Sequence, residues 1–158
     1  MSNEISKIWV RDDVALITIK NLPSDLANIV RIFEAFASRQ INIDLINQTP
    51  QNSNASTDLS FTISETDLSS ALELVALFRQ NRKDIKVDVS PGNTKITVYG
   101  EAMRDAPGFA AGLFRALCEA GTEIRLITTS EIDISLLIPA LDEDKAIHKL
   151  NEIFDVQV

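Results

Sequence analysis

The sequence is short of the residues that enzymes most often use for catalysis. Its 158 residues hold one cysteine and one histidine. A lone cysteine cannot form an internal disulfide, and Cys118 is expected to pack within a helix as a small side chain. His148 is expected on the polar side of the last helix. No phosphate-cradling glycine loop and no metal-ligand spacing is found, so the sequence predicts no catalytic residue, no metal site and no cofactor.

Long apolar runs and basic clusters are also lacking. No segment reaches the roughly 18 apolar residues that a membrane-spanning helix needs, and the N-terminus shows no signal-peptide pattern. The 15 Lys and Arg residues are scattered among 23 Asp and Glu residues, with a net charge of −8. Nucleic-acid binding proteins concentrate basic residues on one face instead. We therefore expect a cytoplasmic protein that binds neither membrane nor nucleic acid.

What the sequence does contain is an internal repeat with an offset of about 80 residues. Ala15–Ile19 and Lys95–Val98 alternate in the manner of strands, and each leads into a helical apolar pattern. The helices are expected at Asp25–Ser38 and Pro107–Ala120. The motif Phe33-Glu34-Ala35-Phe36 of the first helix matches Phe114-Arg115-Ala116-Leu117 of the second.

The parallel continues to the end of the chain. Further strands are expected at 41–46, 59–63, 122–127 and 132–138, helices at 67–80 and 141–153, and closing strands at 85–89 and 155–158. The fold class is therefore α+β, with two tandem ferredoxin-like βαββαβ domains, each an antiparallel four-stranded sheet with helices on one face. Residues 12–90 form the first domain and 91–158 the second. A turn at Ser90–Asn93 joins them, 48–57 form a polar loop, and strand 5–10 pairs with an edge of the second sheet.

One stretch of the second repeat resembles a known family. The run Val98–Ile138 is similar to the last regulatory domain of aspartokinases, an ACT domain that senses small molecules. The residues that carry the resemblance are Gly100, Met103, Pro107, Gly108 and the turn Thr128-Thr129-Ser130-Glu131-Ile132. The first repeat resembles the preceding aspartokinase domain more weakly, at Ile41–Gln48 and Ser56–Ile63.

The resemblance implies an amino-acid ligand near the first strand–helix loop, at an interface between domains. A helix N-terminus offers free N–H groups to a carboxylate, and Gly108 lets a ligand approach the backbone. Asp105 would accept from the ligand ammonium, or cap the helix. The candidate binding residues of the second repeat are Asp105, Pro107, Gly108, Phe109, Glu123, Ile124 and Thr129.

The first repeat departs from the family pattern Asp-x-Pro-Gly at this loop. It has Ser24, Asp25 and Ala27 there, and it retains Asn42, Asp44 and Gln48 farther along. These six residues complete the candidate site set. Threonine or lysine is the ligand that the resemblance implies, and the altered first loop favours a different effector there, or none.

The function expected from these patterns is a non-catalytic regulatory protein that senses an amino acid. We expect a homodimer, with ligand sites between the first domain of one chain and the second domain of the other. The chain begins at Met1 without an upstream kinase domain, which predicts a free-standing regulator or a separately made subunit that serves a kinase or other enzyme. The alternatives are a regulatory subunit or fragment of an aspartate kinase, and a scaffold whose ligand sites have decayed.

Overall fold

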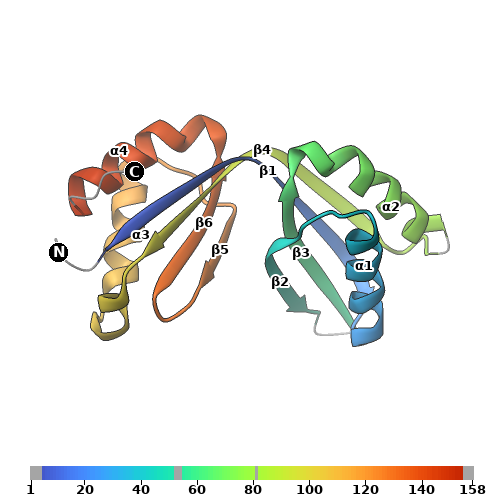
Figure 1. Cartoon of the computed structure of the whole chain (residues 1–158). Coiled ribbons are helices and arrows are strands. Elements are labelled where there is room, and N and C mark those ends of the chain that lie inside the picture. Colours follow the sequence, from blue (N-terminus) through green and yellow to red (C-terminus); the bar gives the residue numbers. More distant parts are fainter. Residues whose placement is uncertain (1–4, 52–54, 81, 155–158) are drawn as a thin grey trace. The chain divides into compact units, whose positions relative to one another are not determined.

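The computed structural model describes residues 5–51, 55–80 and 82–154 (Figure 1). The chain divides into two compact units. The first unit is Asp13–Pro91, and the second unit is Met1–Asp12 together with Gly92–Val158. Two long strands, β1 (Lys7–Pro23) and β4 (Lys86–Tyr99), contribute residues to both. Each unit therefore builds its own sheet from part of these strands.

The first unit contains helices α1 (Leu26–Ser38) and α2 (Leu68–Gln80) and strands β2 (Asp44–Pro50) and β3 (Ser56–Ser64). Its strands lie in the order β2-β3-β1-β4. Ile17 of β1 lies opposite Phe61 of β3 in antiparallel register. Both helices cover the same face of the sheet, as Figure 1 shows.

The second unit contains α3 (Phe109–Glu119), α4 (Glu143–Phe154), β5 (Leu126–Thr129) and β6 (Asp133–Pro139). Its strand order is β1-β4-β6-β5. Ile96 of β4 lies opposite Leu136 of β6, and the Ser6 N–H, just before β1, donates to the Tyr99 carbonyl at 2.8 Å. Short 3-10 helices η1 (Glu65–Asp67), η2 (Glu101–Asp105) and η3 (Ala140–Asp142) precede α2, α3 and α4. The predicted α+β class with repeated βαββαβ units is confirmed.

The repeat read from the sequence is also a repeat of packing. Ile32 and Phe36 of α1 are buried, as are Leu113 and Leu117 at the matching positions of α3. Burial at a spacing of four places each pair on one face of its helix. The Phe36 ring meets Phe61 edge to face, with 5.2 Å between centroids, a favoured aromatic geometry.

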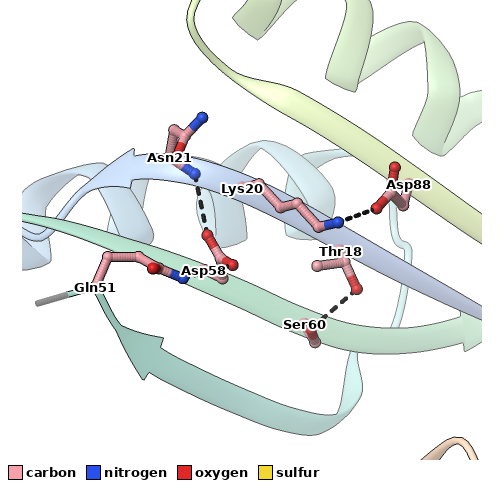
Figure 2. A network of polar contacts seen from close by, with 7 residues as sticks. All are labelled: Thr18, Lys20, Asn21, Gln51, Asp58, Ser60 and Asp88. Atoms are coloured by element: carbon pink, nitrogen blue, oxygen red, sulfur yellow. Dashed lines mark hydrogen bonds and ion pairs between the residues drawn. The ribbon is translucent and has the colours of Figure 1, made fainter.

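A smaller repeated feature lies on the polar face of each sheet. Thr18 of β1 and Ser60 of β3 share a hydroxyl hydrogen bond of 3.0 Å, drawn in Figure 2. Thr97 of β4 and Ser135 of β6 share one of 2.9 Å. Each pair joins two neighbouring strands across the sheet. The two units therefore repeat this hydroxyl contact between strands as well as their cores.

Strand boundaries differ from the sequence-based expectation around residues 90–93 and within residues 5–19. The turn expected at Ser90–Asn93 is wrong, because β4 runs through it; Gly92 takes a left-handed φ of 71° within the strand. Asn93 is buried and accepts from Arg125 Nη1 at 2.6 Å, so tertiary contacts outweigh the local turn propensity. The strands expected at 5–10 and 15–19 are one strand, β1, with a left-handed residue at Asp13.

Three further expectations concern the polar segment, the last strand and Cys118. The polar segment 48–57 is not all loop, because Gln48–Pro50 pair with residues 57–59 as part of β2. Residues 52–54 and the closing strand expected at 155–158 lie outside the described residues. The expectation that Cys118 is a packing residue is wrong, because its side chain is exposed on α3. The neighbouring Leu117 lies on the buried face of that helix.

Candidate ligand site

The start of α3 is built around a left-handed glycine. Gly108 is the N-cap residue, with φ 89° and ψ −1°, and no side chain caps the helix there. A residue other than glycine would be strained at this φ. A Cβ added to Gly108 would meet no protein atom within 4 Å, so the backbone faces open space. The Phe109 N–H donates to the Ala106 carbonyl at 3.2 Å, so the N–H groups of Ala110 and Ala111 are the ones left in the first turn of α3 for a ligand.

A pocket of about 280 Å³ opens beside this helix start. Its wall comes from η2, from the first turn of α3, and from the turn between β5 and β6. Its lining residues are Met103, Ala106, Gly108, Phe109, Ala110, Thr129, Ser130, Glu131 and Ile134. The pocket thus joins an uncapped helix N-terminus to hydroxyl groups and an apolar floor.

The turn between β5 and β6 is held by its own hydrogen bonds. Ser130 Oγ donates to Asp133 Oδ2 at 2.5 Å and accepts from the Asp133 N–H at 3.1 Å. The Gly100 N–H donates to the Ile132 carbonyl at 2.9 Å. An exposed ion pair of 3.0 Å between Arg104 and Glu131 links this turn to η2. These contacts fix the far wall of the pocket against the loop before α3.

Asp105 does not cap α3, so that reading of the residue is wrong. It ends η2 and is exposed, and the cap position belongs to Gly108. Asp105 is not among the residues that line the pocket. Pro107 lies in the turn before the helix and not in its first helical turn. The ammonium role proposed for Asp105 remains a prediction.

The other candidates of the second unit divide by position. Gly108, Phe109 and Thr129 line the pocket, and Glu123 and Ile124 do not. The Glu123 N–H donates to Asp142 Oδ2 at 2.9 Å, and Ile124 packs against the core. A hydrogen bond from Lys145, assisted by that of the Glu123 amide, holds the pKa of Asp142 below its ordinary value. This acidic contact joins the start of α4 to the segment before β5.

At the corresponding loop of the first unit, a side chain caps the helix that follows. Asp25 is the N-cap of α1, and its carboxylate accepts from the Ala27 N–H at 3.0 Å. The Ser24 N–H donates to the Ala55 carbonyl at 2.8 Å. A pocket of about 320 Å³ nearby is lined by Asn21, Pro23, Ala55, Ser56 and Asp84. None of the candidate residues of the first unit lines that pocket.

The retained candidates of the first unit lie on or beside β2. Asn42 is exposed before the strand, and Gln48 is exposed on it. Asp44 is half-buried, and its carboxylate accepts from the Leu45 N–H at 2.8 Å. None of Asn42, Asp44 and Gln48 lines the pocket beside Asn21 and Asp84, and their role in a site of the first unit stays a prediction.

Polar side chains on this sheet instead satisfy one another (Figure 2). Asp58 accepts from the Asn21 N–H at 3.1 Å with one oxygen and from Gln51 Nε2 at 2.8 Å with the other. Lys20 pairs with Asp88 at 2.5 Å, and this hydrogen bond raises the Lys20 pKa. These polar groups, which lie near the loop before α1, are therefore already hydrogen-bonded or ion-paired with one another.

Comparison with known proteins decides the family. A family model described as the ACT domain matches residues 96–154. The aspartokinase of Geobacillus stearothermophilus is 33% identical over 147 residues, which cover 93% of this chain and 35% of that protein. A solved structure of aspartokinase alpha and beta subunits is 31% identical with a TM-score of 0.82, over 96% of this chain and 99% of that one. The chain belongs to the aspartokinase regulatory family of ACT-domain proteins.

A further structure places the resemblance in the regulatory part of these proteins. The regulatory subunit of aspartate kinase from Thermus thermophilus, solved in a ligand-free form, is 25% identical with a TM-score of 0.83, over 96% of this chain and 99% of that one. The chain spans about a third of the length of the curated aspartokinases it matches. It is thus an ACT regulatory chain related to aspartokinase regulation.

Sequence reasoning missed several residues of the pocket in this ACT chain. These are Met103, Ala106, Ala110, Ser130, Glu131 and Ile134. Met103, Ser130 and Glu131 belong to the motif that carried the family resemblance, so the signal was present but was read as a family marker. Ala106 and Ala110 carry no polar signal, and only the path of η2 into α3 places them here.

Two kinds of feature are absent from the described residues of this ACT chain. Over residues 5–51, 55–80 and 82–154, no three or more His, Cys, Asp or Glu side chains gather in a way that could hold a metal ion. Across the same ranges no helix is both long and apolar enough to cross a membrane.

Proposed function

We propose that this ACT chain is a non-catalytic regulatory protein that binds an amino acid in the pocket beside Gly108. The observation that carries the proposal is the uncapped start of α3, which opens into a pocket of about 280 Å³. A helix N-terminus without a capping side chain offers N–H groups and a partial positive charge to a carboxylate. The pocket is near the small end of the range usual for ligand sites, which suits an amino acid.

Each part of an amino acid has a partner near this helix start. The carboxylate would accept from the N–H groups of Ala110 and Ala111, because the Phe109 N–H already donates to the Ala106 carbonyl. The exposed Asp105 would accept from the ammonium. The hydroxyl groups of Thr129 and Ser130 and the apolar floor formed by Phe109 and Ile134 would select the side chain. Threonine and lysine are the first ligands to test, because the resemblance to aspartokinases implies them.

We further propose a cytoplasmic homodimer in which a second copy completes the site. Two-fold dimers are the commonest oligomers, and β2 lies at the edge of the strand order, where backbone groups are free to pair. Ligand binding would then favour one arrangement of the subunits, which a partner enzyme would read. Light scattering at micromolar concentration should give the dimer mass, and a monomer there would count against this assembly.

Calorimetric titration with each of the twenty amino acids tests the ligand. We expect heat with threonine, lysine or a close analogue, and we expect Asp105→Ala to weaken that binding without unfolding the chain. Asp144→Ala is the matched control, since Asp144 is also exposed but lies in the first turn of α4. If none of the twenty amino acids gave heat of binding, a scaffold whose sites have decayed would be favoured instead. An unchanged affinity in Asp105→Ala would remove the ammonium role of that residue alone.

A second candidate is a regulatory subunit or fragment of an aspartate kinase. It is favoured by the likeness to nearly the whole of a chain from the alpha and beta subunit structure and by the short span relative to the curated aspartokinases. A kinase-domain chain from the same source should co-elute with this chain, and its activity should become sensitive to the bound amino acid. Separate elution, with heat still seen in the titration, would leave the free-standing sensor as the better description.

A further inference from the structure

The first unit contains a pocket that the proposed amino-acid site does not use. Its volume is about 220 Å³, and all its lining residues lie between Ile19 and Val87, within one unit. They come from β1, from α1 and α2, and from β4 and the segment before it. Figure 1 shows these elements together in the first unit. The pocket contains none of the candidate ligand residues from the sequence.

The floor of this pocket is apolar and well packed. Ile19, Leu22, Ile32, Val75 and Ile85 line it, and each is no more than 4% exposed. Leu77 of α2 also lines it, although 52% of this side chain is exposed. This large aliphatic side chain is half exposed to water beside a concave apolar wall. A bound apolar group would cover it and so remove apolar surface from water.

The polar side chains around that floor are basic or neutral. Among the described residues that line the pocket, only Arg31, Arg82 and Asn28 have polar side chains, and none is Asp or Glu. This is notable in a chain with 23 acidic and 15 basic residues. Arg31 and Arg82 form no ion pair within the described ranges, whereas Arg39 and Arg104 each pair with a glutamate. The lining of this apolar cavity therefore carries two arginines and, among the described residues, no acid.

We propose that this pocket binds a small carboxylic acid with an apolar chain and no ammonium group. A guanidinium group matches a carboxylate in shape and charge and can hold it through two parallel hydrogen bonds. An ammonium would find no carboxylate here and would lose its hydration without compensation. The volume lies below the roughly 300–1,000 Å³ of drug-sized sites, which limits the ligand to a chain of about six carbons.

The competing explanation is that the two arginines only cover apolar surface with their aliphatic stems. Arginine side chains often do this while the charged group stays in water. That explanation predicts no preference for a negative charge. The two explanations therefore differ in the ligand charge and in the effect of removing the guanidinium groups.

The test is an NMR titration of amide shifts with four six-carbon probes: hexanoate, 1-hexanol, hexylamine and leucine. We expect hexanoate to shift amides of α1, α2 and the end of β1, with at least tenfold weaker binding of the other three. The double variant Arg31→Gln, Arg82→Gln should weaken hexanoate binding by tenfold or more. Arg79→Gln is the matched control, because Arg79 is an exposed arginine of α2 that does not line the pocket.

The same experiment can overturn the proposal. Equal binding of 1-hexanol and hexanoate, unchanged hexanoate binding in the double variant, or no shifts at millimolar hexanoate would each do so. Shifts confined to the segment around Gly108 would also do so, since they would mean that hexanoate enters the proposed amino-acid pocket. The amide spectrum of the double variant itself shows whether its fold is retained. Because the proposed amino-acid site lies in the second unit, its failure and the failure of this proposal are separate outcomes.

Discussion

The two units start their first helices in opposite ways. In the first unit the Asp25 carboxylate accepts from the Ala27 N–H, so the helix start is satisfied from within. In the second unit Gly108 takes that position, no side chain caps the helix, and a pocket lies beside it. The same fold thus offers a closed helix start in one copy and an open one in the other.

The contrast shows which parts of the two repeated units differ in sequence and which are the same. The buried positions of α1 and α3 match, and both sheets keep the Thr–Ser hydroxyl pair. These contacts hold each unit together, and altering them destabilises the fold. The loop before the helix contributes little to the core, so its chemistry can diverge between copies. A difference between copies at such a loop is therefore a better guide to function than the features they share.

The largest expected effect tests the shared core. Phe36→Ala should lower the free energy of unfolding by about 3–5 kcal/mol, and Leu117→Ala at the matching position by about 2–5 kcal/mol. Both side chains are fully buried, and each truncation leaves a cavity. Urea unfolding measures the loss, with the exposed Leu141→Ala as control. A loss below about 1 kcal/mol at one position only would break the structural equivalence of the two helices.

The next effect tests the open helix start. Gly108→Val should cost about 1–3 kcal/mol of stability, because a β-branched residue is strained at φ 89°. Gly108→Asn should cost much less, since asparagine tolerates this conformation. A Cβ meets no protein atom there, so any loss of amino-acid affinity in a folded Gly108→Asn variant would reflect a ligand near the backbone. Equal stability of the valine and asparagine variants would contradict the left-handed geometry.

A smaller effect separates the two aspartates. Asp25→Ala should lower the free energy of unfolding by about 1 kcal/mol, because it removes the cap of α1. Asp105→Ala should change it by less than about 0.5 kcal/mol, as an exposed residue without a cap role. If Asp105 holds the ammonium, its variant should lose about tenfold in amino-acid affinity and Asp25→Ala should lose none. The reverse pattern would place the ligand in the first unit.

The sequence was sufficient for the fold, because periodicity marks buried faces directly. Ile29, Phe36, Leu113 and Leu117 are apolar at a helical spacing, and all four are buried. The same reasoning failed at Ser90–Asn93, where Pro and Gly indicated a turn. There, pairing with β6 and the Arg125–Asn93 hydrogen bond keep the chain extended. Both are long-range contacts that local propensity does not contain.

The sequence predicted only those residues of the candidate site that carry a local signal. Gly108 carries a local conformational signal, and it lies in the pocket with its neighbour Phe109. The alternative role of Asp105 as a cap rested on its spacing alone, but η2 intervenes and Gly108 takes the cap position. Ile134 enters the pocket from β6, and this depends on sheet register. Spacing along the chain cannot supply that.

The smallest expected effect concerns acid stability at the start of α4. The pKa of Asp142 is held below its ordinary value, chiefly by the hydrogen bond from Lys145. The ionised form is therefore favoured in the folded chain, and its contribution is fully present above the ordinary Asp pKa of about 3.9. It is lost as the pH falls through the lower folded-state value. Asp142→Asn should remove this part of the pH dependence while changing little else.

Thermal unfolding of the wild type and Asp142→Asn between neutral pH and about pH 3 measures this effect. The stability gap between the two proteins should narrow as the pH falls, because protonation removes the charge that the variant lacks throughout. Asp67→Asn is the matched control, since Asp67 ends η1 in the first unit as Asp142 ends η3 in the second. An equal narrowing in both variants would mean that the two helix starts carry the same acid-sensitive contact, and the difference between the units would then be confined to the loops before α1 and α3.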